Sequence, residues 1–480
     1  MARRLVLAVL AAAMLAAPAA AGAATINVAI TGDALNGSID DVGCTLRDAV
    51  QAANTNSSDP DGCAGDNVGA DTIVLQSGKT YVLHMHGVDD TNAAGDLDIS
   101  GPLTIRSSGP GLARIDAASN TAPGQPVGAD RAIHVLGTAG EVTLQGVRVE
   151  NGFVGNSTAG YAGGGGILTE SLLVLRGSEV VDNRAQGSGY LVGGGIWAQT
   201  PTARLRILAS TIAGNTIVQQ GNSAVGAGVG AYPDVTELTI ENSTITGNQA
   251  EGGLSARAGG IFGGDYLNSP ASTLTNVTVT GNSAIGMGGI WLRGSISGSL
   301  IAGNTSDDTF DHDSDCYTSG AVISGGGNIL GDGGEDGGAD CGFTAASDLV
   351  GSSAAPIVPN LGTLVDNGGP TRTRVPNPGS AAIDRGGPCP ATDQRGLFRF
   401  ASAPCDSGAV EVGASITPPP PPPPPLVPVG PAPPAPPAAN SATGLRAAAL
   451  ARCGKLKKAT KKQTRKARNK CRVKARKLPL

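Results

Sequence analysis

Short runs in which apolar and polar residues alternate recur along the middle of the chain. They read EVTLQGVRVENG from Glu141, LLVLRGSEVVDN from Leu172, ARLRILASTIAGN from Ala203, TELTIENSTITGN from Thr236, STLTNVTVTGN from Ser272 and SISGSLIAGN from Ser295. Alternation of this kind is typical of β-strands with one buried face. In the fourth run, the step from Ile240 to Ser243 breaks the period of two. The runs therefore predict pairs of short strands separated by a bend.

An asparagine ends each run, and a glycine-rich element lies between successive runs. The asparagines are Asn151, Asn183, Asn215, Asn248, Asn282 and Asn304, at spacings of 32, 32, 33, 34 and 22 residues. The glycine-rich elements are GGGI ending at Ile167, GGGI at Ile196, GAGV at Val229, AGGI at Ile261 and MGGI at Ile290. Asparagine tolerates a left-handed backbone at a turn, and glycine allows close approach of two backbones. We expect the asparagines to stack in one column and to form a ladder of side-chain amides.

A unit of about thirty residues cannot bury its own apolar face, so it must stack on copies of itself. A β-propeller and a leucine-rich repeat are disfavoured, because the aromatic signatures of the first and the leucine consensus of the second are missing. We predict an all-β fold, a right-handed parallel β-helix. Strands stacked about 4.8 Å apart in roughly ten coils would make a rod about 50 Å long.

The segment CTLRDAVQAAN, which begins at Cys44, predicts a short helix in front of the β-helix. Its apolar residues from Leu46 to Ala53 fall at helical spacing, so one face is apolar. Thr45 can cap the start of the helix, and Asn54 lies at its expected end. Such a helix would cover the first coil and protect its open edge from pairing with another chain.

The N-terminus has the pattern of a secretory signal. Arg3 and Arg4 precede an apolar stretch and then a run of small residues, and we expect cleavage between Ala21 and Thr25. No later segment reaches about 18 continuous apolar residues, so no transmembrane span is predicted. The expected localisation is extracellular or at the cell surface.

We expect six parts along the chain. They are a signal peptide (1–24), an N-terminal cap with the helix (25–70), the β-helix (71–355), a C-terminal module (356–415), a Pro-rich linker (416–440) and a basic tail (441–480). Residues 418–437 include 14 prolines, which favours a stiff, extended spacer. The linker and the tail are predicted to be disordered.

Composition agrees with a repeated, turn-rich body. The chain contains 73 glycines and only 3% aromatic residues, without a collagen triplet. Charge is strongly asymmetric. Residues 446–477 carry 15 Lys and Arg and no acid, whereas residues 25–444 carry 39 acids against 17 bases, a formal charge of −22. The overall charge of −5 describes neither part.

Eight cysteines in an exported chain favour disulfides over free thiols. The simplest connectivity joins sequence neighbours. The pairs would be Cys44–Cys63, Cys316–Cys341, Cys389–Cys405 and Cys453–Cys471. Zinc binding would need closely spaced ligands such as CxxC pairs, and there are none.

Three groups of motifs resemble known families of exported bacterial proteins. GCTLRDAVQAAN from Gly43 resembles the CSLREA motif, and the Gly-Gly-Ile and Val-x-x-Asn alternation is similar to repeats of polymorphic outer-membrane proteins. NLGTLVDNGGPTRTRVPNPGSAAIDRG from Asn360, TDQRG from Thr392 and CDSGAVE from Cys405 resemble the choice-of-anchor Q module. The resemblance covers residues 25–412 and implies a secreted or surface β-helix of the pectin-lyase-like shape. The chain lacks an LPxTG sorting motif followed by a membrane span, so the resemblance does not say how it is attached.

An acidic stretch from Asp307 to Asp340 contains nine acids. Within it Asp311, Asp313 and Asp315 alternate, and carboxylates are the hard oxygen ligands that Ca²⁺ prefers. An EF-hand is excluded, because Cys316 stands where that loop needs glycine. The alternative is a solvated loop closed by a disulfide. Calcium is the only cofactor that the sequence suggests.

Two further pairs are candidate sites. His84 and His86 would share one face of a strand and could begin a metal site, but a third ligand is not evident, and the alternative is an exposed strand face. Asp393 and Arg395 in the C-terminal module are either a buried structural ion pair or part of a ligand site.

No pattern identifies a catalytic site. The glycine-histidine-glycine and arginine-isoleucine-lysine patterns of polygalacturonases are missing. We predict a secreted or cell-surface protein with a structural, adhesive or glycan-binding role. The alternative is a carbohydrate-active enzyme, a polysaccharide lyase or hydrolase, with a calcium-assisted acidic site. Partners for the basic tail would be anionic wall polymers or lipid headgroups rather than nucleic acid, because the chain is exported; a merely solvated tail is the other interpretation.

Overall fold

A computed structural model describes the chain in segments. These are residues 23–33, 43–58, 62–65, 69–85, 87, 89–118, 130–157, 161–231, 235, 237–253, 255–263, 272–307, 315–317, 322–334, 341–387, 389–400, 404–417, 442–455 and 461–478. The chain divides into two units, Met1–Pro419 and Pro420–Leu480. The predicted Pro-rich linker lies almost wholly outside the described residues.

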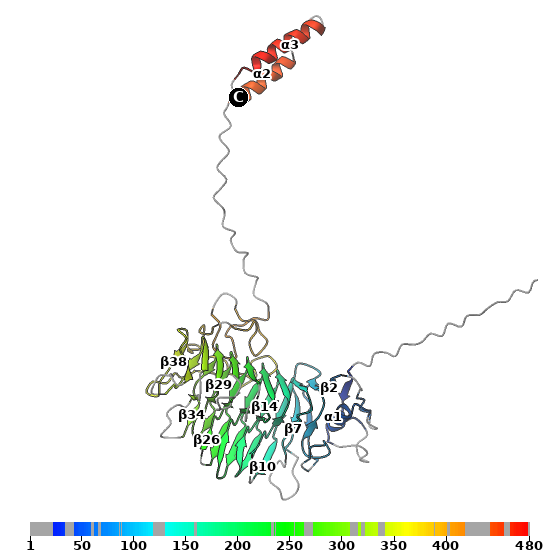
Figure 1. Ribbon diagram of the computed structural model, residues 1–480, viewed down its shortest axis with the longest axis vertical. Coiled ribbons are helices and arrows are strands. Elements are labelled where there is room, and N and C mark those ends of the chain that lie inside the picture. The colour runs from blue at the N-terminus through cyan, green and yellow to red at the C-terminus, as the bar shows by residue number, and fades with distance from the viewer. Residues whose placement is uncertain are drawn as a thin grey trace, which may run out of the picture. The chain divides into compact units, whose positions relative to one another are not determined.

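The first unit is a stack of parallel strands, so the predicted parallel β-helix is confirmed (Figure 1). A full coil passes through five sheets, which we number in the order in which the chain visits them. Sheet 1 contains β1 (Thr25–Val28), β2 (Asp71–Leu75), β5 (Leu103–Ser107), β8 (Glu141–Gln145), β13 (Leu172–Arg176), β18 (Arg204–Leu208), β23 (Glu237–Glu241), β28 (Ser272–Thr275), β32 (Gly294–Ser297) and β36 (Val322–Gly326). Sheet 2 contains β3 (Thr80–Val82), β6 (Ala113–Asp116), β9 (Val147–Glu150), β14 (Glu179–Val181), β19 (Thr211–Ala213), β24 (Thr244–Thr246), β29 (Thr278–Thr280), β33 (Leu300–Ile301), β37 (Ile329–Leu330) and β38 (Leu349–Val350).

The other three sheets are shorter. Sheet 3 contains β10 (Phe153–Ser157), β15 (Arg184–Gly187), β20 (Thr216–Gln219), β25 (Gln249–Gly252), β30 (Ser283–Ala284) and β34 (Thr305–Ser306). Sheet 4 contains β11 (Tyr161–Gly163), β16 (Tyr190–Val192), β21 (Ser223–Val225) and β26 (Ser255–Arg257). Sheet 5 contains β4 (Leu97–Ile99), β7 (Ile133–Val135), β12 (Ile167–Thr169), β17 (Ile196–Ala198), β22 (Val229–Ala231), β27 (Ile261–Phe262), β31 (Ile290–Trp291) and β35 (Cys316–Tyr317).

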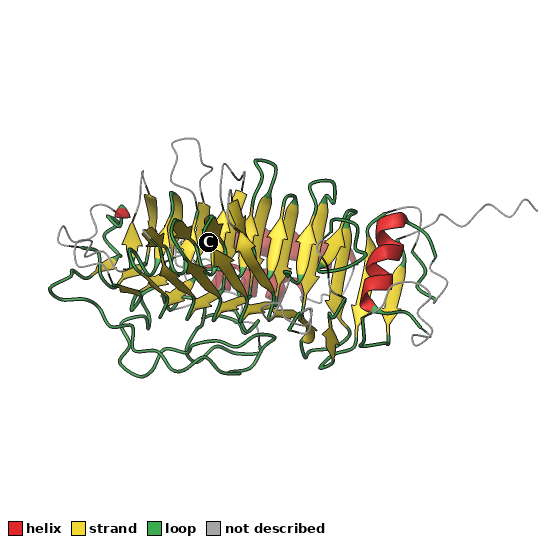
Figure 2. Cartoon of the chain, turned by 90° about the horizontal axis from the view of Figure 1, so that it is seen from below, coloured by secondary structure: helices red, strands yellow, loops and turns green. Residues whose placement is uncertain are grey.

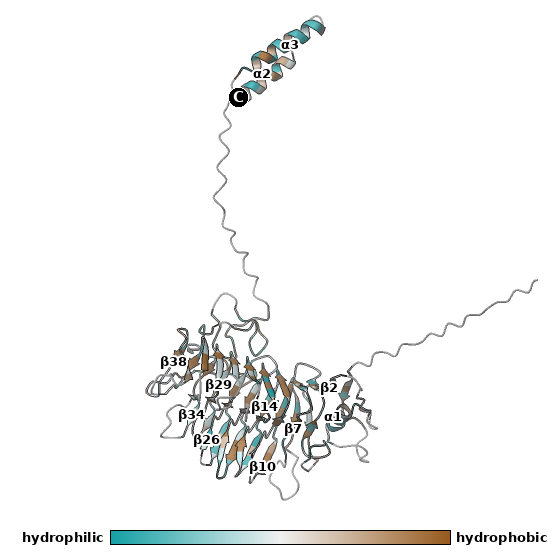
Figure 3. Ribbon diagram, in the orientation of Figure 1, coloured by the Kyte–Doolittle hydropathy of each residue, from teal (hydrophilic) through white to brown (hydrophobic). Residues whose placement is uncertain are grey.

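The core consists of columns of aliphatic side chains, one from each coil. One buried column in sheet 1 runs through Ile26, Ile73, Ile105, Leu144, Leu175, Ile207, Ile240, Leu274 and Ile296. The alternation seen in the sequence places these residues inside and their neighbours outside. Each coil thereby covers the apolar face of the next, and Figure 3 shows the apolar residues concentrated on the stacked strands. Sheets 3 and 4 enclose a smaller core made mostly of alanine, with Leu191 and Ile217.

The predicted cap is α1 (Leu46–Thr55), which lies across one end of the stack (Figure 2). Thr45 caps its first turn as predicted, in a capping box with Asp48. The helix ends at Thr55, one residue later than expected, and its C-cap is Asn56, with φ of 48°. Asn54 has another role, because its amide bonds the backbone of Asp98 at 2.6 Å and thereby ties the helix to β4.

The predicted asparagine ladder is present over five members. The Nδ2 of Asn183 donates to Oδ1 of Asn215 at 2.9 Å, and Asn215 donates to Asn248 at 2.8 Å. Asn248 and Asn282 continue the chain of bonds, each at 2.8 Å, to Asn304. Each of these oxygens also accepts the backbone N–H of the preceding asparagine. All five side chains are buried, so the ladder satisfies polar groups that water does not reach.

Asn151 is not part of this ladder, which corrects the prediction. In the paired register Arg148 lies opposite Glu179, so Asn151 is one position short of Asn183. Gly152 occupies the ladder position instead, and its N–H donates to Oδ1 of Asn183 at 2.9 Å. Asn151 takes a left-handed backbone, with φ of 60°.

The glycine-rich elements make room for the ladder. A Cβ built on Gly166 would lie 2.8 Å from the side chain of Asn183, and one on Gly195 would lie 2.8 Å from that of Asn215. Such contacts are too close for any other residue, so glycine and asparagine depend on each other along this edge. The repeated Gly-Gly-Ile and Asn motifs of the sequence thus pack against each other, glycine on one side of the contact and asparagine on the other.

Four disulfides join the cysteines as the sequence predicted. The Cα–Cα distances are 5.0 Å for Cys44–Cys63, 6.2 Å for Cys316–Cys341, 6.5 Å for Cys389–Cys405 and 5.4 Å for Cys453–Cys471. The first closes the loop that holds α1, and the last lies in the second unit.

The second unit differs from the prediction of a disordered tail. Its described residues form two helices, α2 (Ala442–Gly454) and α3 (Lys461–Ala475). The segment is rich in Ala, Lys and Arg, which have high helix propensity, and the Cys453–Cys471 disulfide joins the helices into a hairpin. A high density of like charge favours disorder, but the helix propensity of the same residues and the disulfide favour the hairpin.

Replacing Asn248 by alanine tests the ladder. It removes the acceptor of Asn215 and the donor to Asn282 inside a buried column, so we expect a loss of about 2–4 kcal/mol in the free energy of unfolding, measured in urea. The matched control is Asn222→Ala at an exposed loop position, which should cost less than about 0.5 kcal/mol. Equal losses in the two variants would contradict a special role of the ladder.

Candidate functional site

The predicted calcium ligands divide into two groups. Asp311 and Asp313 lie outside the described residues, so a site formed by them stays a prediction. Asp315 is buried and ends the asparagine ladder: its Oδ1 accepts Nδ2 of Asn304 at 2.7 Å, and its Oδ2 accepts the N–H of Asp332 at 2.7 Å. A carboxylate has no N–H of its own to satisfy, which suits the last position of the ladder. Burial raises the pKa of Asp315 to about 6.

The two other candidate pairs of the sequence differ in what the structure shows of them. His84 is exposed and its backbone N–H bonds Asp33, while His86 lies outside the described residues. Asp393 and Arg395 form an ion pair of 2.7 Å, with Asp393 fully buried. Asp393 also accepts the backbone N–H of Glu411 at 3.1 Å. This geometry agrees with the structural interpretation of the pair.

The C-terminal module packs on the outer face of sheet 2. Gln394, which lies between the two residues of that ion pair, bridges adjacent coils: it accepts the hydroxyl of Thr244 at 2.6 Å and donates to that of Thr211 at 2.8 Å. Farther along, Arg372 pairs with Glu179 at 3.0 Å. The module therefore satisfies a column of polar side chains that points away from the core.

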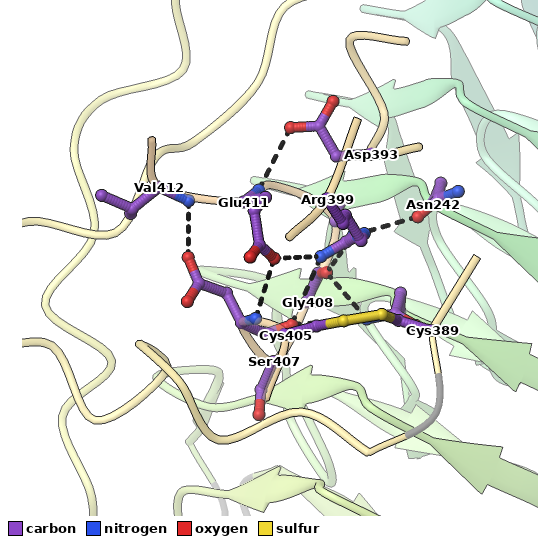
Figure 4. Close-up of polar contacts among 12 residues, drawn as sticks. Asn242, Cys389, Asp393, Arg399, Cys405, Ser407, Gly408, Glu411 and Val412 are labelled. Carbon is purple, nitrogen blue, oxygen red and sulfur yellow. Dashed lines mark hydrogen bonds and ion pairs between the residues drawn. A yellow bond between two sulfur atoms is a disulfide. The ribbon is translucent and has the colours of Figure 1, made fainter. Parts of the chain in front are cut away.

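A buried ion pair holds the rest of the module (Figure 4). Arg399 lies 3.0 Å from Glu411, and its guanidinium also donates to Oδ1 of Asn242, in the turn after β23, at 3.0 Å. Burial raises the pKa of Glu411 and that of Asp406, and it lowers the pKa of Arg399. The group thus joins the module to the coils through buried polar contacts, which agrees with a structural role.

A groove of about 500 Å³ runs between the module and the coils. Arg114, Arg148 and Arg372 line it together with Glu179. These arginines pair with glutamates: Arg148 and Arg372 both bond Glu179, and Arg114 bonds Glu150. The pairing neutralises much of the positive charge that an anionic ligand would need.

A polar cluster on the first coils was missed in the sequence. Asp98 and His134 are adjacent in sheet 5, and both point outward, because the residues that flank them are buried apolar ones. Asp90 reaches the same place from the loop before β4. The alternation in LDI and IHV was the available signal, but only the register of the coils could show that Asp98 and His134 meet. Beside them, burial raises the pKa of Asp96 well above its usual range, although Arg131 opposes the shift.

The helical hairpin presents its charge along α3, whose hydrophilic character is visible in Figure 3. Four lysines, spaced four residues apart, lie on one side of the helix, and all four are exposed: Lys462, Lys466, Lys470 and Lys474. A row of arginines runs beside them: Arg465, Arg468, Arg472 and Arg476. Residues at this spacing are neighbours on a helix surface, about 6 Å apart along the axis. The hairpin thus carries two parallel lines of positive charge.

No family model, curated protein or solved structure matched this chain. Within the described residues, no helix is long and apolar enough to cross a membrane.

The raised pKa of Asp315 predicts a pH dependence of stability. The folded carboxyl holds its proton up to about pH 6, whereas an unfolded aspartate loses it near pH 4. Between these values the unfolded chain binds fewer protons, so the free energy of unfolding should fall as pH rises, by on the order of 3 kcal/mol, and stay lower above pH 6. Asp315→Asn should remove this component, seen as the difference between two urea-unfolding profiles measured from pH 3.5 to 7. Parallel profiles would contradict it.

Proposed function

We propose that this protein is an exported, cell-surface β-helix with a structural, adhesive or glycan-binding role, and that its basic hairpin holds it on an anionic wall polymer. The observation that carries the proposal is the pair of cationic rows on α3, in a segment with 15 bases and no acid. The β-helix supplies a stable elongated body, and the loops between its strands supply variable surface.

Export is supported by the N-terminal pattern of charged, apolar and small residues. It is supported independently by the use of cysteine, because all eight residues pair and no free cysteine remains. Such pairing persists in oxidising compartments. The resemblance to CSLREA-motif and choice-of-anchor Q proteins points to the same surface location.

The spacing of charge on α3 suits a linear polyanion. Lysines four residues apart place a positive charge about every 6 Å, so successive anionic groups of an extended polymer can each meet a cation. Like charges at this spacing repel one another and destabilise an isolated helix by a few tenths of a kcal/mol per pair. A bound polyanion removes that repulsion, so binding and helix stability should reinforce each other.

A body with a formal charge of −22 would be repelled by the same polymer. Because the excess of positive charge lies in residues 446–477, the attachment would use this segment and leave the acidic body free. A merely solvated tail would need neither the two rows nor the disulfide that joins the helices.

Binding to purified cell walls tests the attachment. We expect the full chain to sediment with walls that retain their anionic polymers and to stay in solution with walls from which these polymers have been extracted. Changing the four exposed lysines of α3 to glutamine should weaken binding and lower the slope of log affinity against log salt by roughly three to four, because fewer counterions are released.

The matched control changes the same four lysines to arginine. This variant keeps the charge and a comparable helix propensity, so binding and its salt dependence should remain. Salt-independent binding, or equal binding of the glutamine and arginine variants, would overturn the proposal.

A further inference from the structure

We propose that Asp90, Asp98 and His134 form a binding site for a divalent transition-metal ion on the outer face of sheet 5. The site goes beyond the proposed attachment and is independent of it, because it lies on the first coils of the β-helix and uses no residue of the hairpin.

The β-helix itself fixes two of the three ligands. Asp98 in β4 pairs in register with His134 in β7, so the two side chains occupy the same outward position on adjacent coils. Their inward neighbours Leu97 and Ile133 are completely buried and hold the strands in place. Ligands on a rigid sheet keep their separation without a large entropic cost on binding.

The buried ligand atoms lack hydrogen bonds within the part of the chain that the structure describes. Oδ1 of Asp98 and both ring nitrogens of His134 lack a hydrogen bond among the described residues, although both side chains are more than nine-tenths buried. A buried polar atom without a hydrogen-bond partner destabilises the folded state, because it has lost its bonds to water and gained none in the protein. Oδ1 of Asp98 and Nδ1 of His134 face one another, which suggests that a bound ion supplies the missing interaction.

The distances suit a metal better than a hydrogen bond. Nδ1 of His134 lies 3.3 Å from Oδ1 of Asp98 and 3.4 Å from Oδ1 of Asp90. Ligand atoms about 2.0–2.1 Å from one ion at tetrahedral angles lie roughly 3.3–3.4 Å apart. The three ligand atoms all lie within 4.8 Å of one another, so one ion can reach them together.

The surroundings orient these ligands as the neighbours of metal sites do. Oδ2 of Asp98 accepts the backbone N–H of Asn92 at 2.9 Å, which turns Oδ1 toward His134. On the far side of the ring, Nε2 of His134 faces Oε1 of Glu170 at 3.9 Å. A carboxylate behind a ligating histidine fixes the ring and increases its basicity. A small closing movement of Glu170 would complete that bond.

The donor set and the local charge define the class of ion. An imidazole with two carboxylates suits zinc, iron or nickel, whereas Ca²⁺ takes oxygen ligands only. Arg131 lies beside the cluster and pairs with Asp96 at 3.3 Å and with Asp130 at 3.9 Å. The side chain of Asp90 is 76% exposed, so the ion would enter and leave from solvent and keep a free position for water or a ligand.

Zinc titration tests the site in the full chain. Protein treated with a chelator and then desalted should bind one equivalent of Zn²⁺, measured by calorimetry at pH 7. His134→Gln and Asp98→Asn should weaken this binding roughly 100-fold or more, and Glu170→Gln roughly 10–100-fold, as expected for a positioning residue. Co²⁺ at the site should show the visible absorption of a four-coordinate ion, and a purely structural role of these residues would not produce it.

The matched control is His84→Gln, which removes an exposed histidine and should leave zinc affinity unchanged. If His134→Gln or Asp98→Asn does not fold, Asp90→Asn supplies the test, because its exposed side chain can change without disturbing the core. Absence of a saturable site, equal affinity of the Asp90→Asn variant and the parent, or equal affinity for Ca²⁺ and Zn²⁺ would overturn the proposal.

Discussion

The buried amide stack of the asparagines is the constraint on which the rest of the β-helix depends. At the corner between sheets 2 and 3 the chain turns with its backbone hidden from water, and the side chain of the next coil must supply the missing bonds. That requirement fixes an asparagine at the same place in five successive coils. It also fixes the glycines that face it, because any larger residue would collide with the amide. Coil length elsewhere is free to vary, as the shorter step from Asn282 to Asn304 shows.

The C-terminal module has a physical reason to fold back on the coils. The outward positions of sheet 2 carry Glu179, Thr211, Thr244 and Thr278 in one column, and these buried polar side chains need hydrogen-bond partners. Arg372, Gln394 and the N–H of Ala409 each meet members of this column. The module is therefore an additional layer of the same unit, although it contains almost no regular strands.

Sequence reasoning succeeded where the signal is local and repeated. Strand alternation, the glycines and the asparagines recur with the same period of about one coil. Together they therefore predict the architecture and most of the ladder. It failed at Asn151, because an asparagine one residue short of the ladder position cannot be told from a member without the strand register. The cluster around His134 was out of reach for the same reason: the long connection between β4 and β7 hides the pairing of Asp98 with His134. In the basic tail, net charge predicts disorder, whereas the helix propensity of Ala, Lys and Arg favours the two helices that the structure shows.

The amide stack has a direction, and this has a consequence for how such a protein can lengthen. Each asparagine donates a hydrogen bond to the side chain of the next coil, and Asp315 accepts the last bond and donates none. A duplicated coil inserted between Asn183 and Asn282 would find a suitable donor on one side and a suitable acceptor on the other. A coil added beyond Asp315 would meet a carboxylate that cannot donate to it. The β-helix can therefore gain length by duplication of an internal coil, while the ladder keeps Gly152 at one end and Asp315 at the other.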